Sequence, residues 1–224
     1  MKPSPRPPRT PSRLSDSVHH QLNLYALAAG AASGLLTMAS PARAEIIYTP
    51  ADVPIPGRYK LDLNHDAKID FVLTNASSTP GSTAVFRLSV KGVENNGVEN
   101  TSGKFASALL PGSQIGPQQK FAKAGLMAVH TVPFWTTWTH KSGPWLNVNN
   151  RYLGLKFTIS GKTHYGWARL SVHLGTEFGN IDALLTGYAY ETIANKAIIA
   201  GKTKGPDVVT MPPDTLGSLA LGRK

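Results

Sequence analysis

Hydrophobic and polar residues alternate with a period of two through much of the second half of the chain. In Arg151–Ser160, four apolar side chains fall on one face: Leu153, Leu155, Phe157 and Ile159. In Thr163–Leu174, one face carries Tyr165, Trp167, Arg169 and Ser171, and the other carries His164, Ala168, Leu170 and Val172. A period of two is typical of β-strands. Together with Ala183–Tyr190, which alternates less cleanly, these runs predict a three-stranded β-meander.

Shorter strand patterns precede this meander. Strands are predicted at Glu45–Pro50, Tyr59–Leu63, Ile69–Leu73 and Thr83–Val90. Residues 110–119 are rich in Pro and Gly and predict a loop, whereas Phe121–Val129 fits a short helix or a strand equally well. About ten short strands separated by turn signals predict an all-β fold, an antiparallel β-sandwich of jelly-roll-like type. Alternating helical patterns of the kind that build a parallel α/β sheet are absent from the sequence.

Composition supports this fold class and removes several kinds of function. Charged residues make up only 16% of the chain, while Gly (21) and Pro (17) are frequent. The formal net charge is +10, but the basic residues are scattered rather than interleaved with aromatic residues in a stripe, so no nucleic-acid partner is predicted. The chain has no Cys, which excludes disulfides, thiolate catalysis and Cys-based metal sites.

The first 44 residues have the organisation of a secretory signal peptide. A basic, Pro-rich start is followed by an apolar segment, Leu22–Ala39, and by a small-x-small pattern ending at Ala44. Cleavage before Glu45 is expected; the alternative is a membrane anchor, for which the Gly- and Ala-rich segment is short. The sequence therefore predicts an exported protein (extracellular, cell-surface or periplasmic) with no stable membrane span after cleavage. Residues 45–201 form its β-sandwich domain, and residues 202–224 form a flexible tail.

Two segments carry a resemblance to a known group of proteins. The segment HYGWARLSV, followed by LLTGYAYETIANKAIIAG, resembles a group of uncharacterised exported bacterial proteins, several of which have a PEP-CTERM-like sorting tail. The start of the mature chain, IIYTPADVPI followed by LDLNHDAKIDFVL, is also similar to that group. The resemblance implies a secreted β-rich domain and no reaction. The tail departs from the pattern: Met211–Asp214 replaces the Pro-Glu-Pro-like motif, and its apolar part is short, so sorting looks degenerate or truncated.

The sharpest local signal is the acidic loop 62–70, DLNHDAKID. Side-chain oxygens occur at loop positions 1, 3, 5 and 9, and a backbone carbonyl is available at position 7: Asp62, Asn64, Asp66, Asp70 and Lys68. Ca²⁺ prefers six to eight hard oxygen ligands, and alternate oxygens in a tight loop wrap one ion. The loop resembles the short calcium loops of dockerin-like and integrin-type repeats, although Ala67 replaces the usual Gly at position 6. A solvated polar turn between two strands remains the alternative.

Three Trp residues lie in an irregular aromatic segment, Thr131–Asn150. Trp135, Trp138 and Trp145 stand among Thr, Asn and Gly residues, and exposed Trp faces in such loops stack on sugar rings. The alternative is that these side chains close one end of the sandwich as part of the core. If they are exposed, polysaccharide of the envelope or matrix is a candidate partner.

Catalytic patterns are weak throughout the sequence. The His residues do not show zinc spacing, and no G-x-S-x-G nucleophile motif is present. The sequence therefore predicts a non-catalytic structural or interaction protein of the bacterial envelope or extracellular matrix, with calcium at the acidic loop as a stabilising ion. A carbohydrate-binding module is the first alternative, and a secreted hydrolase is the second.

Overall fold

The computed structural model describes residues 45–100, 103–135, 138–175 and 179–205, which belong to one compact unit. The predicted signal peptide lies outside the described residues, as do the last nineteen residues of the predicted tail, 206–224. Over the described ranges the regular secondary structure consists of thirteen strands and no helix. The all-β fold predicted from the sequence is confirmed. No helix in these ranges is long and apolar enough to cross a membrane.

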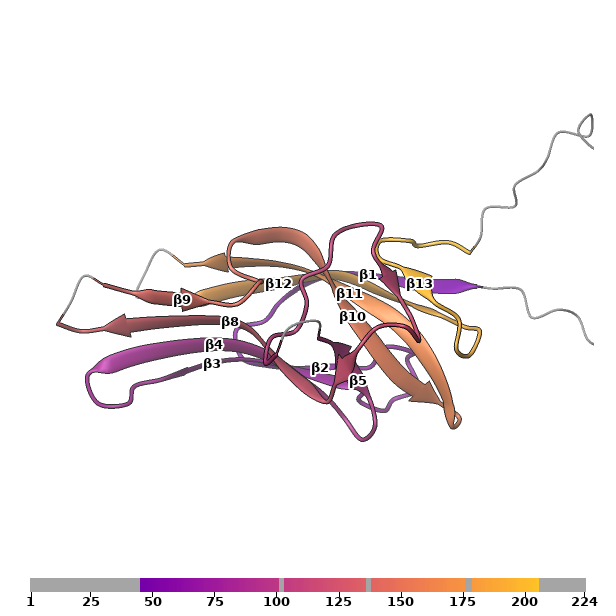
Figure 1. The fold of residues 1–224 in the computed structure, drawn as a ribbon, viewed down its shortest axis with the longest axis horizontal. Helices are drawn as coiled ribbons and strands as arrows, with labels where there is room; N and C mark the ends of the chain where they lie inside the picture. Colours follow the sequence, from indigo (N-terminus) through magenta and orange to yellow (C-terminus); the bar gives the residue numbers. More distant parts are fainter. Residues whose placement is uncertain (1–44, 101–102, 136–137, 176–178, 206–224) are drawn as a thin grey trace, which may run out of the picture. The chain divides into compact units, whose positions relative to one another are not determined.

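The larger sheet has six antiparallel strands in the order β1-β12-β11-β10-β5-β7 (Figure 1). Its strands are β1 (Ile46–Pro54), β5 (Gly97–Glu99), β7 (Phe121–Ala122), β10 (Val148–Ile159), β11 (Lys162–Leu174) and β12 (Ile181–Glu191). The predicted meander is its centre, since β11 pairs with β10 on one side and with β12 on the other. The connection between β10 and β11 is a tight turn at Ser160 and Gly161, both with positive φ.

The second sheet has five antiparallel strands in the order β2-β3-β4-β8-β9. Its strands are β2 (Arg58–Leu61), β3 (Phe71–Ser78), β4 (Thr83–Gly92), β8 (Ala124–Pro133) and β9 (His140–Ser142). A separate pair is formed by β6 (Gln114–Ile115) and β13 (Ile198–Ile199). The ambiguous segment Phe121–Val129 is thus β-structure, divided between β7 and β8. The region predicted as loop at 110–119 also contributes one short strand.

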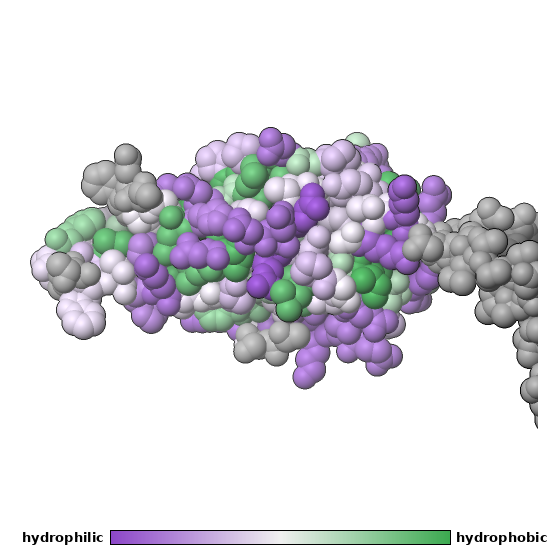
Figure 2. Space-filling view, turned by 90° about the horizontal axis from the view of Figure 1, so that it is seen from above, coloured by the Kyte–Doolittle hydropathy of each residue, from purple (hydrophilic) through white to green (hydrophobic). Residues whose placement is uncertain are grey.

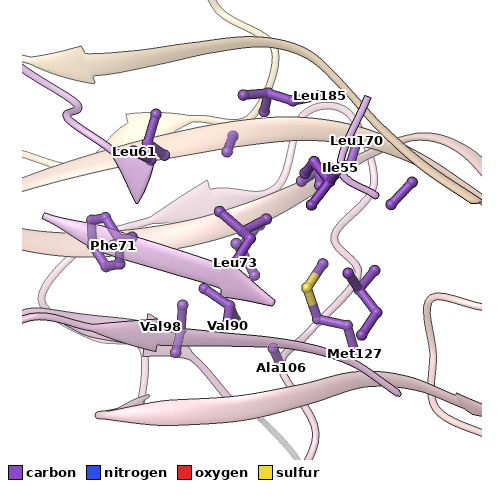
Figure 3. Close-up of a cluster of buried hydrophobic side chains, with 14 of the residues drawn as sticks. Ile55, Leu61, Phe71, Leu73, Val90, Val98, Ala106, Met127, Leu170 and Leu185 are labelled. Carbon is purple, nitrogen blue, oxygen red and sulfur yellow. The ribbon is translucent and has the colours of Figure 1, made fainter. Parts of the chain in front are cut away.

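The main core fills the space between the two sheets. Side chains of the second sheet, such as Phe71 and Leu73, meet side chains of the larger sheet, such as Leu170 and Leu185 (Figure 3). The apolar face predicted for Arg151–Ser160 lies here, because Leu153, Leu155 and Phe157 are buried and Ile159 packs against them. On one outer face of the molecule, by contrast, hydrophobic residues form only separate patches among hydrophilic ones, as Figure 2 shows. The antiparallel β-sandwich is therefore confirmed.

A second, smaller apolar cluster covers the other face of the larger sheet. Trp167 is fully buried there and meets Tyr152 edge to face, with their ring centroids 5.1 Å apart. Ile115 of β6 and Ile198 of β13 are buried in the same cluster. Both faces predicted for β11 thus contribute to a core, although Arg169 and Ser171 on the face of Trp167 are only half-buried.

Candidate functional site

The acidic loop joins β2 to β3 and is organised by its own carboxylates. The two oxygens of Asp62 accept hydrogen bonds from the backbone N–H groups of Asp66 (3.2 Å) and Ala67 (2.8 Å). Oδ1 of Asp66 accepts from the N–H of Lys68 at 2.9 Å. These short-range bonds fold the loop into consecutive turns. An ionised carboxylate has about four lone-pair sites, so Asp62 and Asp66 keep acceptor capacity for a cation.

Two residues of this loop have left-handed backbone conformations. The φ angles are 60° at His65 and 67° at Ala67. Ala67 occupies the position where calcium loops usually have Gly, and a left-handed conformation costs a residue with a Cβ about 1–2 kcal/mol. The loop therefore has the turn that the calcium spacing requires, at some cost in backbone strain. In addition, Oδ1 of Asn64 is buried without a hydrogen-bond partner.

Asp70, the last residue of the loop, is hydrogen-bonded back to the start of the loop at Leu63. Its side chain is buried, Oδ2 accepts from the N–H of Leu63 at 2.9 Å, and Oδ1 accepts from Nδ2 of Asn96 at 3.1 Å. Burial raises the pKa of Asp70, the two hydrogen bonds oppose that rise, and the charges of Asp66 and Asp62 add to it. The charges of Asp66 and Asp62 therefore repel the ionised carboxylate of Asp70. Both Asp70 oxygens already hold one donor each, so this side chain reaches a cation only through its remaining lone pairs.

Further contacts fasten the acidic loop to the larger sheet. Nε2 of His65 lies 2.9 Å from Oγ1 of Thr49 on β1, and its ring lies against Tyr188 of β12 with centroids 5.8 Å apart. On the other side, Oδ1 of Asn96 accepts from the N–H of Thr158 on β10. The acidic loop thus connects the edge of one sheet to the other sheet, so a ligand bound there would stabilise both.

A polar groove of about 480 Å³ lies beside the acidic loop. Its lining includes Asp66, Asp70, Glu94 and Asn96. Over the described residues, however, no group of three or more His, Asp or Glu side chains is arranged closely enough to hold a metal ion. A cation in this loop therefore depends on the amide oxygen of Asn64 and on backbone carbonyls, as the sequence pattern predicts for Lys68. The calcium site stays a prediction.

The aromatic segment divides into an exposed part and a buried part. Phe134, Trp135 and Trp138 lie in the connection between β8 and β9, with 62%, 69% and 82% of their surface exposed. In the sequence Phe134 belongs to the same aromatic group as the Trp residues and directly precedes Trp135. These three residues are called the aromatic tip from here on.

Trp145 does not belong to the aromatic tip, and for this residue the alternative of a core side chain holds. Its side chain is fully buried in the main core, and its indole N–H donates to the backbone carbonyl of Ala106 at 3.0 Å. The turn after β9 carries it inward, because Gly143 has a φ of 110° and lies so close to Met127 that a Cβ would overlap the Met127 carbonyl oxygen. Trp145 therefore presents no face to a ligand.

A second groove, of about 500 Å³, contains Ser171, His173 and Asp182. These are the residue types of a hydrolase triad, but their hydrogen bonds run to other partners. Oγ of Ser171 accepts from the N–H of Asn150, Nε2 of His173 lies 2.9 Å from Oδ1 of Asn149, and Asp182 accepts from Asn180. A nucleophile needs a base within hydrogen-bond reach, and that base needs an orienting partner. The arrangement supports no catalytic assignment.

One buried acid stands apart from the acidic loop. Glu99 at the end of β5 is 2% exposed, and its Oε2 atom is buried with no hydrogen-bond partner. Gly154 of β10 makes room for this carboxyl group, since a Cβ at Gly154 would collide with it. Burial raises the pKa of Glu99 from 4.5 to about 7. Glu99 does not stand out in the sequence, because nothing in the pattern of its neighbours indicates burial.

Comparison of the chain with protein-family models, with curated proteins and with solved structures finds no match. The resemblance to exported proteins with a PEP-CTERM-like tail therefore stays a prediction from sequence motifs. The features that bear on the function of the chain are the geometry of the acidic loop and that of the aromatic tip.

Proposed function

We propose that this chain is an exported, non-catalytic structural or interaction protein whose β-sandwich is stabilised by calcium at the acidic loop. The observation that carries the proposal is the conformation of the loop. Left-handed turns at His65 and Ala67, together with the hydrogen bonds that Asp62 accepts from the N–H groups of Asp66 and Ala67, fold the segment that carries the alternate oxygens into one tight loop. The ligands are Asp62, Asn64, Asp66 and the backbone carbonyl of Lys68, with Asp70 either completing the set or holding the loop from behind.

Calcium binding has a structural rather than a catalytic role in this proposal. In the absence of a cation, the charges of Asp62 and Asp66 repel the buried carboxylate of Asp70. A divalent cation removes that repulsion and fixes a loop that already contacts both sheets through His65 and Asn96. An envelope or matrix protein without disulfides gains stability in this way.

Addition of Ca²⁺ is expected to raise the melting temperature of the mature domain. A ligand at a hundredfold excess over its Kd stabilises the folded state by about 2.7 kcal/mol. For a domain of this size the gain corresponds to a rise of roughly 5–10 °C. Thermal melts in millimolar Ca²⁺ and in excess chelator measure the difference. Identical melting temperatures in the two conditions would leave only a polar turn between two strands.

Three variants sharpen the calcium experiment. Asp66→Ala removes a proposed ligand and should abolish most of the calcium-dependent shift, whereas Asp52→Ala, which removes an exposed carboxylate of β1, should preserve it. Ala67→Gly relieves the left-handed strain at position 67 and should raise the melting temperature with and without Ca²⁺. Equal calcium responses of the Asp66 and Asp52 variants would contradict the assigned ligands.

Export is tested separately from calcium binding. When the full chain is expressed in a bacterium, we expect the mature protein to begin at Glu45, because the small-x-small pattern ends at Ala44. Mass spectrometry of the secreted or periplasmic fraction identifies this N-terminus. Recovery of the intact sequence Met1–Ala44 in the membrane fraction would show an anchor instead and would refute cleavage.

The carbohydrate hypothesis retains two of its three aromatic residues. Trp135 and Trp138 are exposed, but the burial of Trp145 removes the third member of the predicted sugar-stacking surface. Polysaccharide is therefore one of several candidate ligands for the same small aromatic tip. Binding assays of the same Trp variants with each candidate ligand distinguish between them.

A further inference from the structure

The aromatic tip is an unusual concentration of exposed apolar surface for this molecule. Six large hydrophobic residues are described as exposed, and three of them, the most exposed of the set, are Phe134, Trp135 and Trp138. Trp is usually buried to a large extent, and single exposed apolar residues need no explanation, but three within five residues of one hairpin do.

The scaffold beneath the aromatic tip is well supported. The backbone N–H of Phe134 donates to the carbonyl of Ser82 in the β3–β4 turn at 3.0 Å. His130 of β8 contacts the β11–β12 turn through its Nδ1 atom, 2.8 Å from the carbonyl oxygen of Gly179. Hairpin turns from both sheets thus lie together at one end of the sandwich. Figure 1 shows this end at the left, where β3 and β8 end and β4 and β9 begin. The strand that leads into the aromatic tip is therefore tied to both neighbouring hairpins.

The β3–β4 and β8–β9 hairpins at the aromatic tip are basic or neutral, whereas the neighbouring β11–β12 turn is followed by Asp182, which accepts a hydrogen bond from Asn180. Among the described residues 77–87, 128–135 and 138–143 there is no Asp or Glu, while Arg87 and Lys141 are both exposed. Ser and Thr residues make up much of the remainder. A partner that meets this end of the molecule therefore encounters aromatic rings beside positive charge, which complements an anionic surface.

Two kinds of partner fit this end poorly. A stable protein interface buries about 800 Å² on each partner. Three aromatic side chains exposed to this extent offer only roughly 300–500 Å². A sugar ring stacks on an exposed Trp face, but Trp145, the third member of the predicted stacking surface, is buried, and the grooves beside Ile55, Asp66 and Ala106 are lined by other residues. A partner that needs no matching shape, and into which a protruding tip can insert, fits better.

We propose that the aromatic tip binds the surface of an anionic phospholipid bilayer. Phe134, Trp135 and Trp138 enter the boundary between headgroups and acyl chains, where Trp side chains are favoured because they have an apolar body and a polar N–H. Lys141 and Arg87 stay at the level of the lipid phosphates and attract the negatively charged leaflet. Binding is peripheral and reversible, since only a few side chains are inserted. The proposal does not depend on calcium at the acidic loop.

Vesicle binding tests the proposal directly. The mature domain is mixed with vesicles made of equal parts phosphatidylglycerol and phosphatidylcholine, and the bound fraction is measured by sedimentation. We expect binding that weakens as salt is added and that falls about tenfold or more in the Trp135→Ser/Trp138→Ser double variant. Lys141→Ser should weaken binding to these vesicles about fivefold, without a matching effect on vesicles of phosphatidylcholine alone.

Tryptophan fluorescence supplies a second readout, because the chain has four Trp residues and the other two, Trp145 and Trp167, are fully buried. A blue shift on addition of vesicles therefore reports the aromatic tip. A Trp135→Phe/Trp138→Phe variant should lose the blue shift while still sedimenting with vesicles, since Phe keeps the apolar character. Leu110→Ser is the matched control, because Leu110 is 57% exposed in a different connection, between β5 and β6, and should leave binding unchanged.

Three outcomes would overturn the proposal. The first is no sedimentation of the folded wild-type domain with the anionic vesicles. The second is equal vesicle binding by the wild type and the Trp135→Ser/Trp138→Ser variant. The third is binding to a glycan array that this variant abolishes, without any vesicle binding, which would assign the aromatic tip to carbohydrate. Unchanged melting temperatures of the variants establish that loss of binding is not loss of folding.

Discussion

Trp145→Ala is expected to lower the free energy of unfolding by about 3–5 kcal/mol, the range for truncating a large buried aromatic side chain. The substitution leaves a cavity in the main core, in which Trp145 is fully buried. It also removes the indole N–H that donates to the carbonyl of Ala106, so a buried acceptor loses its partner. Because the free energy of unfolding of a natural domain is only about 5–15 kcal/mol, this loss is a large fraction of it.

Trp138→Ala is the matched control for this prediction. The same truncation at a side chain that is 82% exposed should change the free energy of unfolding by no more than about 0.5 kcal/mol. Urea unfolding of the two variants, under one fixed calcium concentration, gives both values. A loss below about 1 kcal/mol for Trp145→Ala, or equal losses for the two variants, would contradict the division of the aromatic segment into tip and core.

Local sequence does not distinguish these two Trp residues. Both stand in a polar, turn-rich segment, and only the path of the backbone separates them. That path depends on Gly143, which lies against Met127 of β8, a strand that precedes it in the sequence. Contacts between distant segments of this kind leave no periodic signal, so the sequence predicted a group of Trp residues without predicting which of them are buried.

The sequence was most informative where one strand follows another directly. The alternation in Arg151–Ser160 and Thr163–Leu174 predicted both the strands and their faces, because a period of two is set by the geometry of the strand itself. The prediction was weaker for β3, which begins at Phe71 and continues to Ser78. Its polar end remains a strand because it pairs with β4 along its whole length. The short strand β6 depends on β13, a partner far away in the sequence, and was not located.

The acidic loop shows the same limit at a candidate site. The spacing from Asp62 to Asp70 predicted a tight turn, and Ala67, at the position where calcium loops usually have Gly, has a positive φ. The partners that hold the loop from outside are Asn96 and Thr49, which are distant in sequence from the residues they contact. Side-chain spacing therefore predicted the internal order of the loop but not its attachment to the larger sheet.

The stability of the domain should fall as the pH rises from 4.5 to 7, and Glu99 is the reason. Burial raises the pKa of Glu99 to about 7 in the folded state, so between these values the unfolded chain releases its proton while the folded chain keeps it. The stabilisation is complete below pH 4.5 and is lost as the pH passes through 7. A difference of this size in pKa corresponds to about 3 kcal/mol.

The Glu99→Gln variant isolates this contribution, because Gln has nearly the same size and does not titrate. Other groups, including Asp70, titrate equally in both proteins and cancel in the comparison. The free energies of unfolding of the variant and the wild type should therefore diverge steadily above pH 4.5, with the variant gaining about 3 kcal/mol relative to the wild type by pH 8. Urea unfolding at several pH values, with calcium held constant, measures the divergence. Two parallel curves would mean that Glu99 has an ordinary pKa and that its buried Oε2 atom has a partner in solution.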